Sequence, residues 1–252
     1  MDTKIIAMAG KGGVGKTSLA AAMVKVLVNT YPDKKILAID ADPAVGLATA
    51  LGVDVAMTVD DIRKEVVASA EKGDASAAVE LLGEARYRIF DALVEPEGFS
   101  FLAIGRPETA GCYCKINGYL KEVIRILAAN FDYIVIDGEA GIEQINRRVM
   151  EKVTHLILVT DSSRKGTQVV QTIRKVADEL VMYEEAGVIV NRLSDENALQ
   201  YMNLGDLPLL SVIPADESLA EFDLMGKNVF YLDDEAAIVN GARKALKTMN
   251  LL

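Results

Sequence analysis

The 252-residue sequence contains no tryptophan, 6% aromatic residues, one histidine and two cysteines. With so few aromatic side chains, a folded interior must be filled mainly by aliphatic residues. Parallel strands that are buried on both faces are built from such residues. Two cysteines are too few for the disulfide framework of a small secreted protein. These shortages favour an aliphatic α/β core and exclude a disulfide scaffold.

Positive charge is also scarce, with 27 Lys and Arg against 37 Asp and Glu and a formal net charge of −10. Binding to nucleic acid or anionic lipid draws on a surplus of cations, so we expect neither nucleic acid nor membrane as a partner. No apolar run approaches the length of about 18 residues that suggests a transmembrane helix. The first run, residues 5–9, leads into a glycine loop and predicts a strand, not a signal peptide, so we expect a cytoplasmic protein.

Apolar runs alternate with amphipathic stretches along most of the chain. Repeated β-α alternation implies right-handed crossovers and a doubly wound, mostly parallel sheet with helices on both faces. We expect strands at residues 5–9, 36–39, 99–103, 133–136, 156–160, 187–190 and 209–212, and helices at 16–29, 118–130, 167–183 and 236–249. In such sheets ligands bind at the carboxyl ends of the strands.

The segment from about residue 60 to 97 has a different character. It is rich in Glu, Lys and Ala and contains two helical patches, residues 62–70 and 77–85, without a clear strand. No low-complexity linker separates it from its neighbours. We therefore expect one P-loop domain over residues 1–252, with residues 60–97 as a helical insertion on the flank of the sheet.

A glycine-rich loop follows the first expected strand, and residues 10–17 read Gly-Lys-Gly-Gly-Val-Gly-Lys-Thr. They fit the P-loop pattern G-x-x-x-x-G-K-[ST], in which backbone N–H groups approach phosphate oxygens and the following helix adds a positive dipole. Lys16 would bridge the β- and γ-phosphates, and the Thr17 hydroxyl would be a ligand of Mg²⁺. A glycine turn without a ligand would not need this strand–loop–helix context. The expected contacts to MgATP are Gly12, Gly13, Val14, Gly15, Lys16, Thr17 and Ser18.

The second lysine of the loop, Lys11, makes the motif similar to the deviant Walker A motif K-G-G-x-G-K-[ST] of the MinD/ParA-like ATPases. In that family this lysine reaches across a dimer to the partner's nucleotide and adds positive charge to the transition state. The resemblance therefore implies an ATP-promoted homodimer in which Lys11 and Lys16 are catalytic. Considered without the family, Lys11 could also be a solvated loop lysine.

Three further positions match the family in order. Asp42, after the strand at 36–39, resembles the switch I aspartate that orients the attacking water. Asp137, at the end of the strand at 133–136, resembles the Walker B residue that holds Mg²⁺ through water. Asn191 stands where the family reads adenine. An isolated Asp at a strand end is often only a cap or turn former, but the resemblance implies that this chain hydrolyses ATP to ADP and phosphate.

Both cysteines lie in one loop, as Cys112 and Cys114 flanking Tyr113. Two thiolates this close can converge on one soft metal ion. Buried, inert cysteines and a redox pair are the alternatives, although a redox disulfide normally has the wider C-x-x-C spacing. The chain has one histidine, His155, which we expect to be packed in a strand. The economical way to complete a four-coordinate site is therefore a two-fold dimer in which each chain contributes Cys112 and Cys114.

A chain that combines the deviant Walker A motif with a C-x-C pair resembles the nickel-insertion ATPases that mature carbon monoxide dehydrogenase. That resemblance implies a homodimeric metallochaperone that binds Ni²⁺ or Zn²⁺, dimerises with metal as well as ATP, and delivers nickel to the apo-enzyme. Two other functions stay open. One is a MinD/ParA-type positioning ATPase, for which the amphipathic stretch 236–247 could bind lipid. The other is an electron-transfer ATPase with a [4Fe–4S] cluster bridging the dimer.

Overall fold

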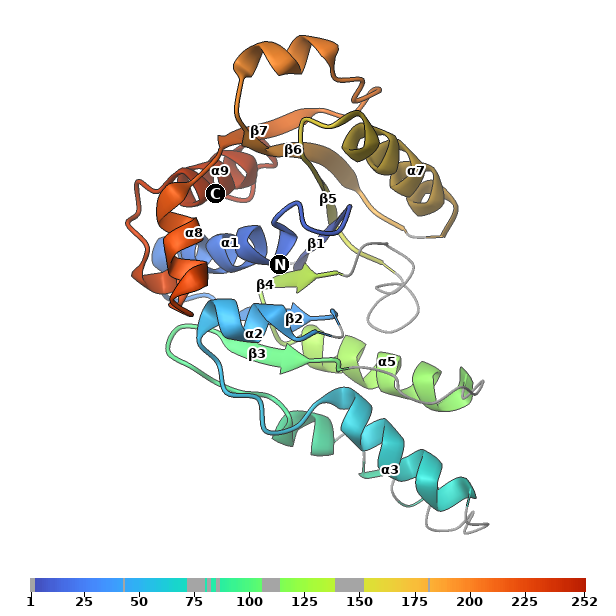
Figure 1. Cartoon of the computed structure of the whole chain (residues 1–252). Coiled ribbons are helices and arrows are strands. Elements are labelled where there is room, and N and C mark those ends of the chain that lie inside the picture. Colours follow the sequence, from blue (N-terminus) through green and yellow to red (C-terminus); the bar gives the residue numbers. More distant parts are fainter. Residues whose placement is uncertain are drawn as a thin grey trace.

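A seven-stranded parallel sheet forms the centre of the molecule (Figure 1). The computed structural model describes residues 3–42, 44–71, 80, 83–84, 87–105, 114–138, 152–180 and 182–252. The strands are β1 (Lys4–Gly10), β2 (Ile36–Asp40), β3 (Ser100–Ala103), β4 (Tyr133–Asp137), β5 (His155–Thr160), β6 (Glu185–Leu193) and β7 (Leu209–Pro214). Their order across the sheet is β3-β2-β4-β1-β5-β6-β7. The predicted doubly wound α/β fold is confirmed.

Every expected strand is present, and most of the apolar runs are buried, although Leu209 at the start of β7 is 42% exposed. In β5 all six residues are buried, and in β2 all five are buried. Such runs are typical of parallel strands that helices cover on both faces. The strand ends differ from the prediction by a few residues, most at β6, which continues beyond the expected residues 187–190 at both ends.

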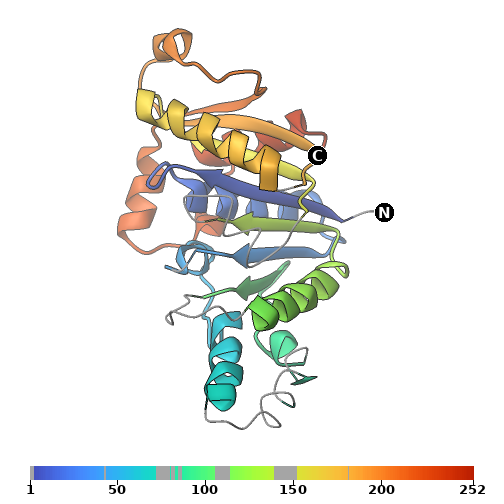
Figure 2. The ribbon, with the colours of Figure 1, turned by 90° about the vertical axis from the view of Figure 1, so that its right-hand side faces the viewer.

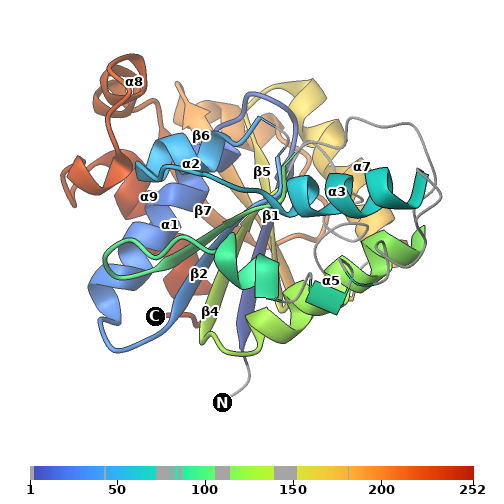
Figure 3. The ribbon, with the colours of Figure 1, turned by 90° about the horizontal axis from the view of Figure 1, so that it is seen from below.

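Helices cover the two faces of the sheet in two layers, as Figure 3 shows. Helices α1, α2 and α9 pack on one face, and α3, α5 and α7 pack on the other. The helices are α1 (Lys16–Thr30), α2 (Gly46–Leu51), α3 (Val59–Glu71), α5 (Cys114–Ala128), α7 (Arg164–Leu180), α8 (Glu217–Leu224) and α9 (Ala237–Thr248). Two short 3₁₀ helices, η1 (Glu196–Tyr201) and η2 (Val229–Tyr231), lie in the connections.

The two layers enclose two separate aliphatic cores. Leu19 of α1 and Leu246 of α9 belong to the first core, and Ile124 of α5 and Val170 of α7 belong to the second. All four side chains are fully buried. The aliphatic interior expected from the shortage of aromatic residues is therefore what holds the helices on the sheet.

The segment from residue 60 to 97 is mainly helical where the structure describes it, but residues 92–97 are not helical and Val94 forms an antiparallel bridge with Phe101. Helix α3 contains the first predicted patch, residues 62–70, and its inner side joins the core through Ile62. Most of the second patch, residues 77–85, lies outside the described residues. Helices α2 and α8 and the two 3₁₀ helices were not predicted, because they are short and carry little periodicity.

The terminal helix α9 buries its apolar side. Ile238, Val239, Ala242 and Leu246 are each at most 1% exposed and lie in the core beside α1 and β7. This stretch therefore uses in packing the apolar face that a lipid-binding helix would present to a membrane. Within the described residues, no helix combines the length and the apolar character needed to cross a bilayer.

All strands point the same way, so their carboxyl ends meet along one edge of the sheet (Figure 2). The loop after β1, the turn after β2 and the ends of β4, β5 and β6 share this edge. The residues singled out in the sequence at these strand ends are thereby brought together from separate parts of the chain.

Candidate nucleotide-binding site

A cavity of about 420 Å³ opens at the carboxyl edge of the sheet, where β1 passes into α1. Backbone N–H groups at the start of a helix are unpaired, and the helix dipole adds positive potential there, so such a loop attracts phosphate. Two cationic side chains and one carboxylate border the loop. The lining residues are Gly12, Gly13, Gly15, Lys16, Thr17, Asp42 and Arg192.

Two positions of the loop require glycine for steric reasons. A Cβ at Gly10 would collide with the carbonyl oxygen of Val159 on the neighbouring strand β5. Gly15, the residue before α1, has φ +89°, and a Cβ there would lie 2.5 Å from the side-chain amide of Asn191. The consensus glycines thus permit close backbone packing as well as the left-handed turns of the loop.

Lys16 is folded back over the loop. It is 8% exposed, and its ammonium donates to the carbonyl oxygens of Gly10 and Lys11, both at 3.3 Å. These long hydrogen bonds keep the charge inside the loop, where a phosphate oxygen would be a stronger acceptor. The bridging of the β- and γ-phosphates by Lys16 stays a prediction from the motif.

Asp137, the last residue of β4, is fully buried. Among the described residues, no donor completes a hydrogen bond to either of its carboxylate oxygens. Burial raises the pKa of Asp137 to about 6, although the nearby Thr17 hydroxyl and the Lys16 charge act in the opposite direction. Burying a carboxylate without a partner costs free energy. The burial of Asp137 is explained if its carboxylate is a ligand of a bound cation.

The oxygen atoms of Thr17 and Asp137 fit Mg²⁺, a hard cation that prefers hydroxyl, carboxylate and phosphate oxygens. When bound with a nucleotide, the ion would supply positive charge to the β- and γ-phosphates. The protein's own contribution is to hold these two oxygens at one side of the loop. Elsewhere in the described chain, no group of three or more His, Cys, Asp or Glu side chains is arranged as a metal site.

Asp40, which ends β2, pairs in register with Asp137 on β4. Its buried carboxylate accepts hydrogen bonds from the backbone N–H groups of Asp42, at 3.1 Å, and Leu47, at 2.8 Å. Burial and the Asp137 charge raise the pKa of Asp40 to about 7. Asp40 therefore ties the turn after β2 to the start of α2 and sets the position of Asp42 above the cavity.

We predict that the Asp137→Asn variant unfolds at a higher temperature than the wild type when both are nucleotide-free. The raised pKa means that ionised Asp137 opposes folding, and this cost appears as the pH rises above about 4 and is complete above about 6. The free energy of unfolding of the variant should exceed that of the wild type by about 1–3 kcal/mol at pH 8. Thermal unfolding at pH 8 and pH 4 measures it, and a gain that is equally large at pH 4 would contradict the explanation.

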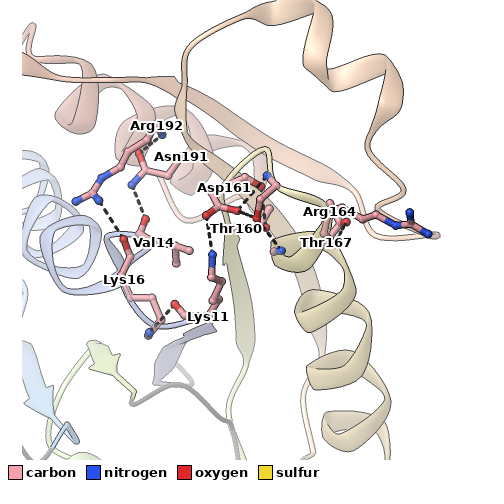
Figure 4. A network of polar contacts seen from close by, with 12 residues as sticks. Lys11, Val14, Lys16, Thr160, Asp161, Arg164, Thr167, Asn191 and Arg192 are labelled. Carbon is pink, nitrogen blue, oxygen red and sulfur yellow. Dashed lines mark hydrogen bonds and ion pairs between the residues drawn. The ribbon is translucent and has the colours of Figure 1, made fainter.

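Lys11 is held within its own chain. Its ammonium lies 3.1 Å from Oδ2 of Asp161, the residue that follows β5 (Figure 4). Burial would raise the pKa of Asp161, but the Ser163 hydroxyl and Lys11 outweigh this and hold it below its usual value. Lys11 is consequently not a freely solvated loop lysine in this structure, and it must leave Asp161 before it can reach another subunit.

Two residues near the carboxyl end of β6 contact the P-loop. The Asn191 side-chain amide donates to the carbonyl of Val14 at 2.8 Å, and the Arg192 guanidinium donates to that of Gly13 at 3.0 Å (Figure 4). Both residues also line a second cavity of about 360 Å³, which Ser18 connects to the loop. The remaining lining residues are Pro214, Ala215, Asp216, Leu219, Ala220, Asp223 and Ile238. This second cavity is therefore adjacent to the phosphate loop.

The cysteine pair cannot be placed in the same way. Cys112 lies outside the described residues, and Cys114 is the first residue of α5. His155 is 3% exposed and its Nδ1 is hydrogen-bonded with the hydroxyl of Thr154 at 2.7 Å. The prediction that this histidine is packed in a strand is confirmed.

The roles of Asp40, Asp161 and Arg192 were not predicted from the sequence. Asp161 directly follows β5 and Arg192 is the next-to-last residue of β6, so the rule that located Asp42 and Asn191 also marks them. Asp40 directly follows the expected strand at 36–39, so the same rule marks it as well. What the sequence did not reveal are the long-range contacts, because Asp137, Lys11 and Gly13 lie on other strands or loops than Asp40, Asp161 and Arg192.

These features define a P-loop protein with a nucleotide site at the carboxyl edge of a parallel sheet. Residues 5–229 match the family described as the CobQ/CobB/MinD/ParA nucleotide binding domain. The chain therefore belongs to this family, and the family predicted from Lys11 and the strand-end residues is confirmed.

Similar proteins are known in several organisms. An uncharacterized ATP-binding protein of Methanocaldococcus jannaschii is 38% identical over 226 residues, 88% of either chain. The carbon monoxide dehydrogenase accessory protein CooC of Rhodospirillum rubrum is 29% identical over 242 residues, covering 87% of this chain and 89% of CooC. The structure of Pyrococcus horikoshii MinD complexed with Mg-ADP shares the fold, with a TM-score of 0.66, 24% identity and coverage of 98% and 96%.

Proposed function

We propose that this protein is an ATP-hydrolysing, dimeric metallochaperone that carries nickel to apo-carbon monoxide dehydrogenase. The observation that carries the proposal is the presence, in one chain, of Lys11 in a P-loop and of the pair Cys112 and Cys114. Similarity to CooC along most of the chain supports the same assignment. The reaction is ATP + H₂O → ADP + phosphate, and the metal ion is the cargo.

Each residue of the site has a separate role in hydrolysis. Lys16 and the N–H groups of the loop hold the β- and γ-phosphates, and Asp137 and Thr17 hold Mg²⁺. Asp42 borders the phosphate cavity, where its carboxylate can orient a water molecule toward the γ-phosphate. We place adenine in the second cavity, which Asn191 borders.

Dimer closure provides the link between ATP and the metal. Lys11 would exchange Asp161 of its own chain for the nucleotide of the partner, so that ATP brings two chains together. Two copies of the loop that carries Cys112 and Cys114 would then supply four sulfur ligands. Hydrolysis removes the γ-phosphate and weakens the closed dimer, which allows the metal to be released.

We predict that Lys11→Gln binds nucleotide but no longer forms a dimer with ATP, since the charge that would reach the partner's phosphates is lost. Asp161→Asn is the matched variant, because it releases Lys11 from its own chain and should still dimerise. Sedimentation velocity with ATP and with ADP measures both. A Lys11→Gln protein that dimerises and hydrolyses ATP like the wild type would show that Lys11 has no role across the interface.

Metal content of the wild-type protein, measured with and without ATP, tests the proposed function directly. We expect one divalent metal per dimer and a change in its affinity when ATP binds. Anaerobically purified protein distinguishes the alternatives, because a [4Fe–4S] cluster is brown whereas a zinc site is colourless. ATP-driven dimers without bound metal would favour a positioning ATPase.

A further inference from the structure

Arg192 has an unusual backbone for its place in a strand. Its φ is +57°, in the left-handed region that residues other than Gly, Asn and Asp rarely adopt. It lies within β6, where the pairing with β7 is irregular between Val190 and Leu193. Irregular strand pairings of this kind often lie next to active sites and redirect a side chain. A residue held in a sparsely populated conformation is itself a reason to look for a function.

The irregularity directs two consecutive side chains to one loop. In a regular strand, neighbouring side chains point to opposite faces of the sheet. Here Asn191 and Arg192 both reach the P-loop, where they donate to the carbonyls of Val14 and Gly13 at 2.8 Å and 3.0 Å. Asn191 is 3% exposed, and its Oδ1 accepts from the backbone N–H of Arg192 at 3.0 Å, which ties the Asn191 side chain to the backbone of Arg192.

These two hydrogen bonds determine where the loop's N–H groups point. A trans peptide is planar, and its C=O and N–H point in opposite directions. When Arg192 holds the Gly13 carbonyl, the N–H of Val14 points away from the Arg192 guanidinium. When Asn191 holds the Val14 carbonyl, the N–H of Gly15 is turned in the same way. Inward N–H groups are what a P-loop offers to phosphate oxygens.

We propose that Asn191 and Arg192 form a clamp that orients two peptide planes of the P-loop for phosphate binding, and that Arg192 is a positioning residue. The inference deepens the proposed ATP-binding function and rests on it. It does not depend on the metal or on the recipient enzyme. Arg192 would act on every ligand that carries a polyphosphate, whatever its base.

The loop needs such a clamp because glycines surround both peptide planes. Gly13 and Gly15 have φ values of +81° and +89° and lie on either side of Val14. Glycine rotates between backbone regions at little steric cost, so these planes could turn away when no nucleotide is bound. A preorganised loop avoids this reorientation at the moment of binding, and preorganisation raises affinity.

The test compares two ligands, MgATP and magnesium tripolyphosphate, which has the phosphates but no base or ribose. Arg192→Gly removes the guanidinium and also suits the left-handed backbone, so the variant should fold at least as well as the wild type. We expect both ligands to bind on the order of tenfold more weakly to Arg192→Gly, which corresponds to one lost charge-assisted hydrogen bond. Arg192→Lys should recover part of this loss, and Asn191→Ser should weaken both ligands as well. Isothermal titration calorimetry measures the affinities.

Asn250→Gly is the matched control, because Asn250 has φ +54° and lies beyond the end of α9, away from the loop. It should bind both ligands like the wild type. If the Arg192 and Asn191 variants bind only MgATP more weakly, these residues contact the base or ribose. If the variants bind both ligands like the wild type, the proposed clamp is refuted. Amide NMR signals of Val14 and Gly15 in the ligand-free Arg192→Gly protein should shift, whereas direct contact of Arg192 with phosphate would leave them in place. A wild type that binds neither ligand would instead refute the nucleotide site itself.

Discussion

Lys16→Ala should bind ATP at least about a hundredfold more weakly than the wild type, a loss of about 3 kcal/mol. Removing one partner of a buried charge pair typically costs about 2–5 kcal/mol, because the remaining charge is left unpaired. Here the unpaired charge would be that of the β- and γ-phosphates. Lys16 is almost buried and already lies over the loop, and no other cation lines the cavity among the described residues except Arg192. Equilibrium binding of a fluorescent ATP analogue measures the effect.

Two further variants make this result specific. Lys247→Ala removes an exposed lysine from the last turn of α9 and should leave nucleotide binding unchanged. Asp42→Ala should bind ATP but lose turnover, since a residue that orients water matters mainly in the transition state. If Lys16→Ala binds ATP within threefold of the wild type, the P-loop does not hold the phosphates as assigned.

Removing both cysteines should have the largest effect on metal binding. We expect wild-type protein to hold one divalent metal per dimer and Cys112→Ala/Cys114→Ala to hold none. A thiolate must lose its proton to bind metal, so the affinity of the wild type should fall as the pH drops below the free thiol pKa of about 8.5. Elemental analysis paired with the molar mass in solution gives the stoichiometry.

Nucleotide binding is the internal control for the cysteine variant. Its P-loop is unchanged, so MgATP should bind to the monomer with wild-type affinity, while dimerisation driven by metal is lost. By linkage, any factor by which ATP changes metal affinity must equal the factor by which metal changes ATP affinity, and such couplings typically amount to about 1–3 kcal/mol. One metal per monomer, or undiminished metal in the variant, would refute a four-sulfur site shared by two chains.

Several assignments were predictable because their signals are local. The strands are continuous aliphatic runs, and burial on both sides of a parallel sheet is the only efficient use of such runs. The P-loop is a contiguous pattern whose strand–loop–helix context is also contiguous, so the roles predicted for Lys16 and Thr17 rest on the residues around them in the chain. The short helices α2 and α8 escaped prediction since neither is long enough to show a helical period.

What the sequence by itself determined is the fold class, the phosphate loop and the family. Only the tertiary structure decided which distant residues meet. The strand order places β4 between β2 and β1, which sets the Asp137 charge beside Asp40, where it adds to burial in raising the pKa of Asp40. The same position buries Asp137 within the sheet, and this burial raises its own pKa. The strand order also places Asp161 next to Lys11 across 150 positions of sequence. The physical reason is that hydrophobic periodicity specifies each strand and its faces, whereas the neighbours of a strand depend on how the whole sheet packs.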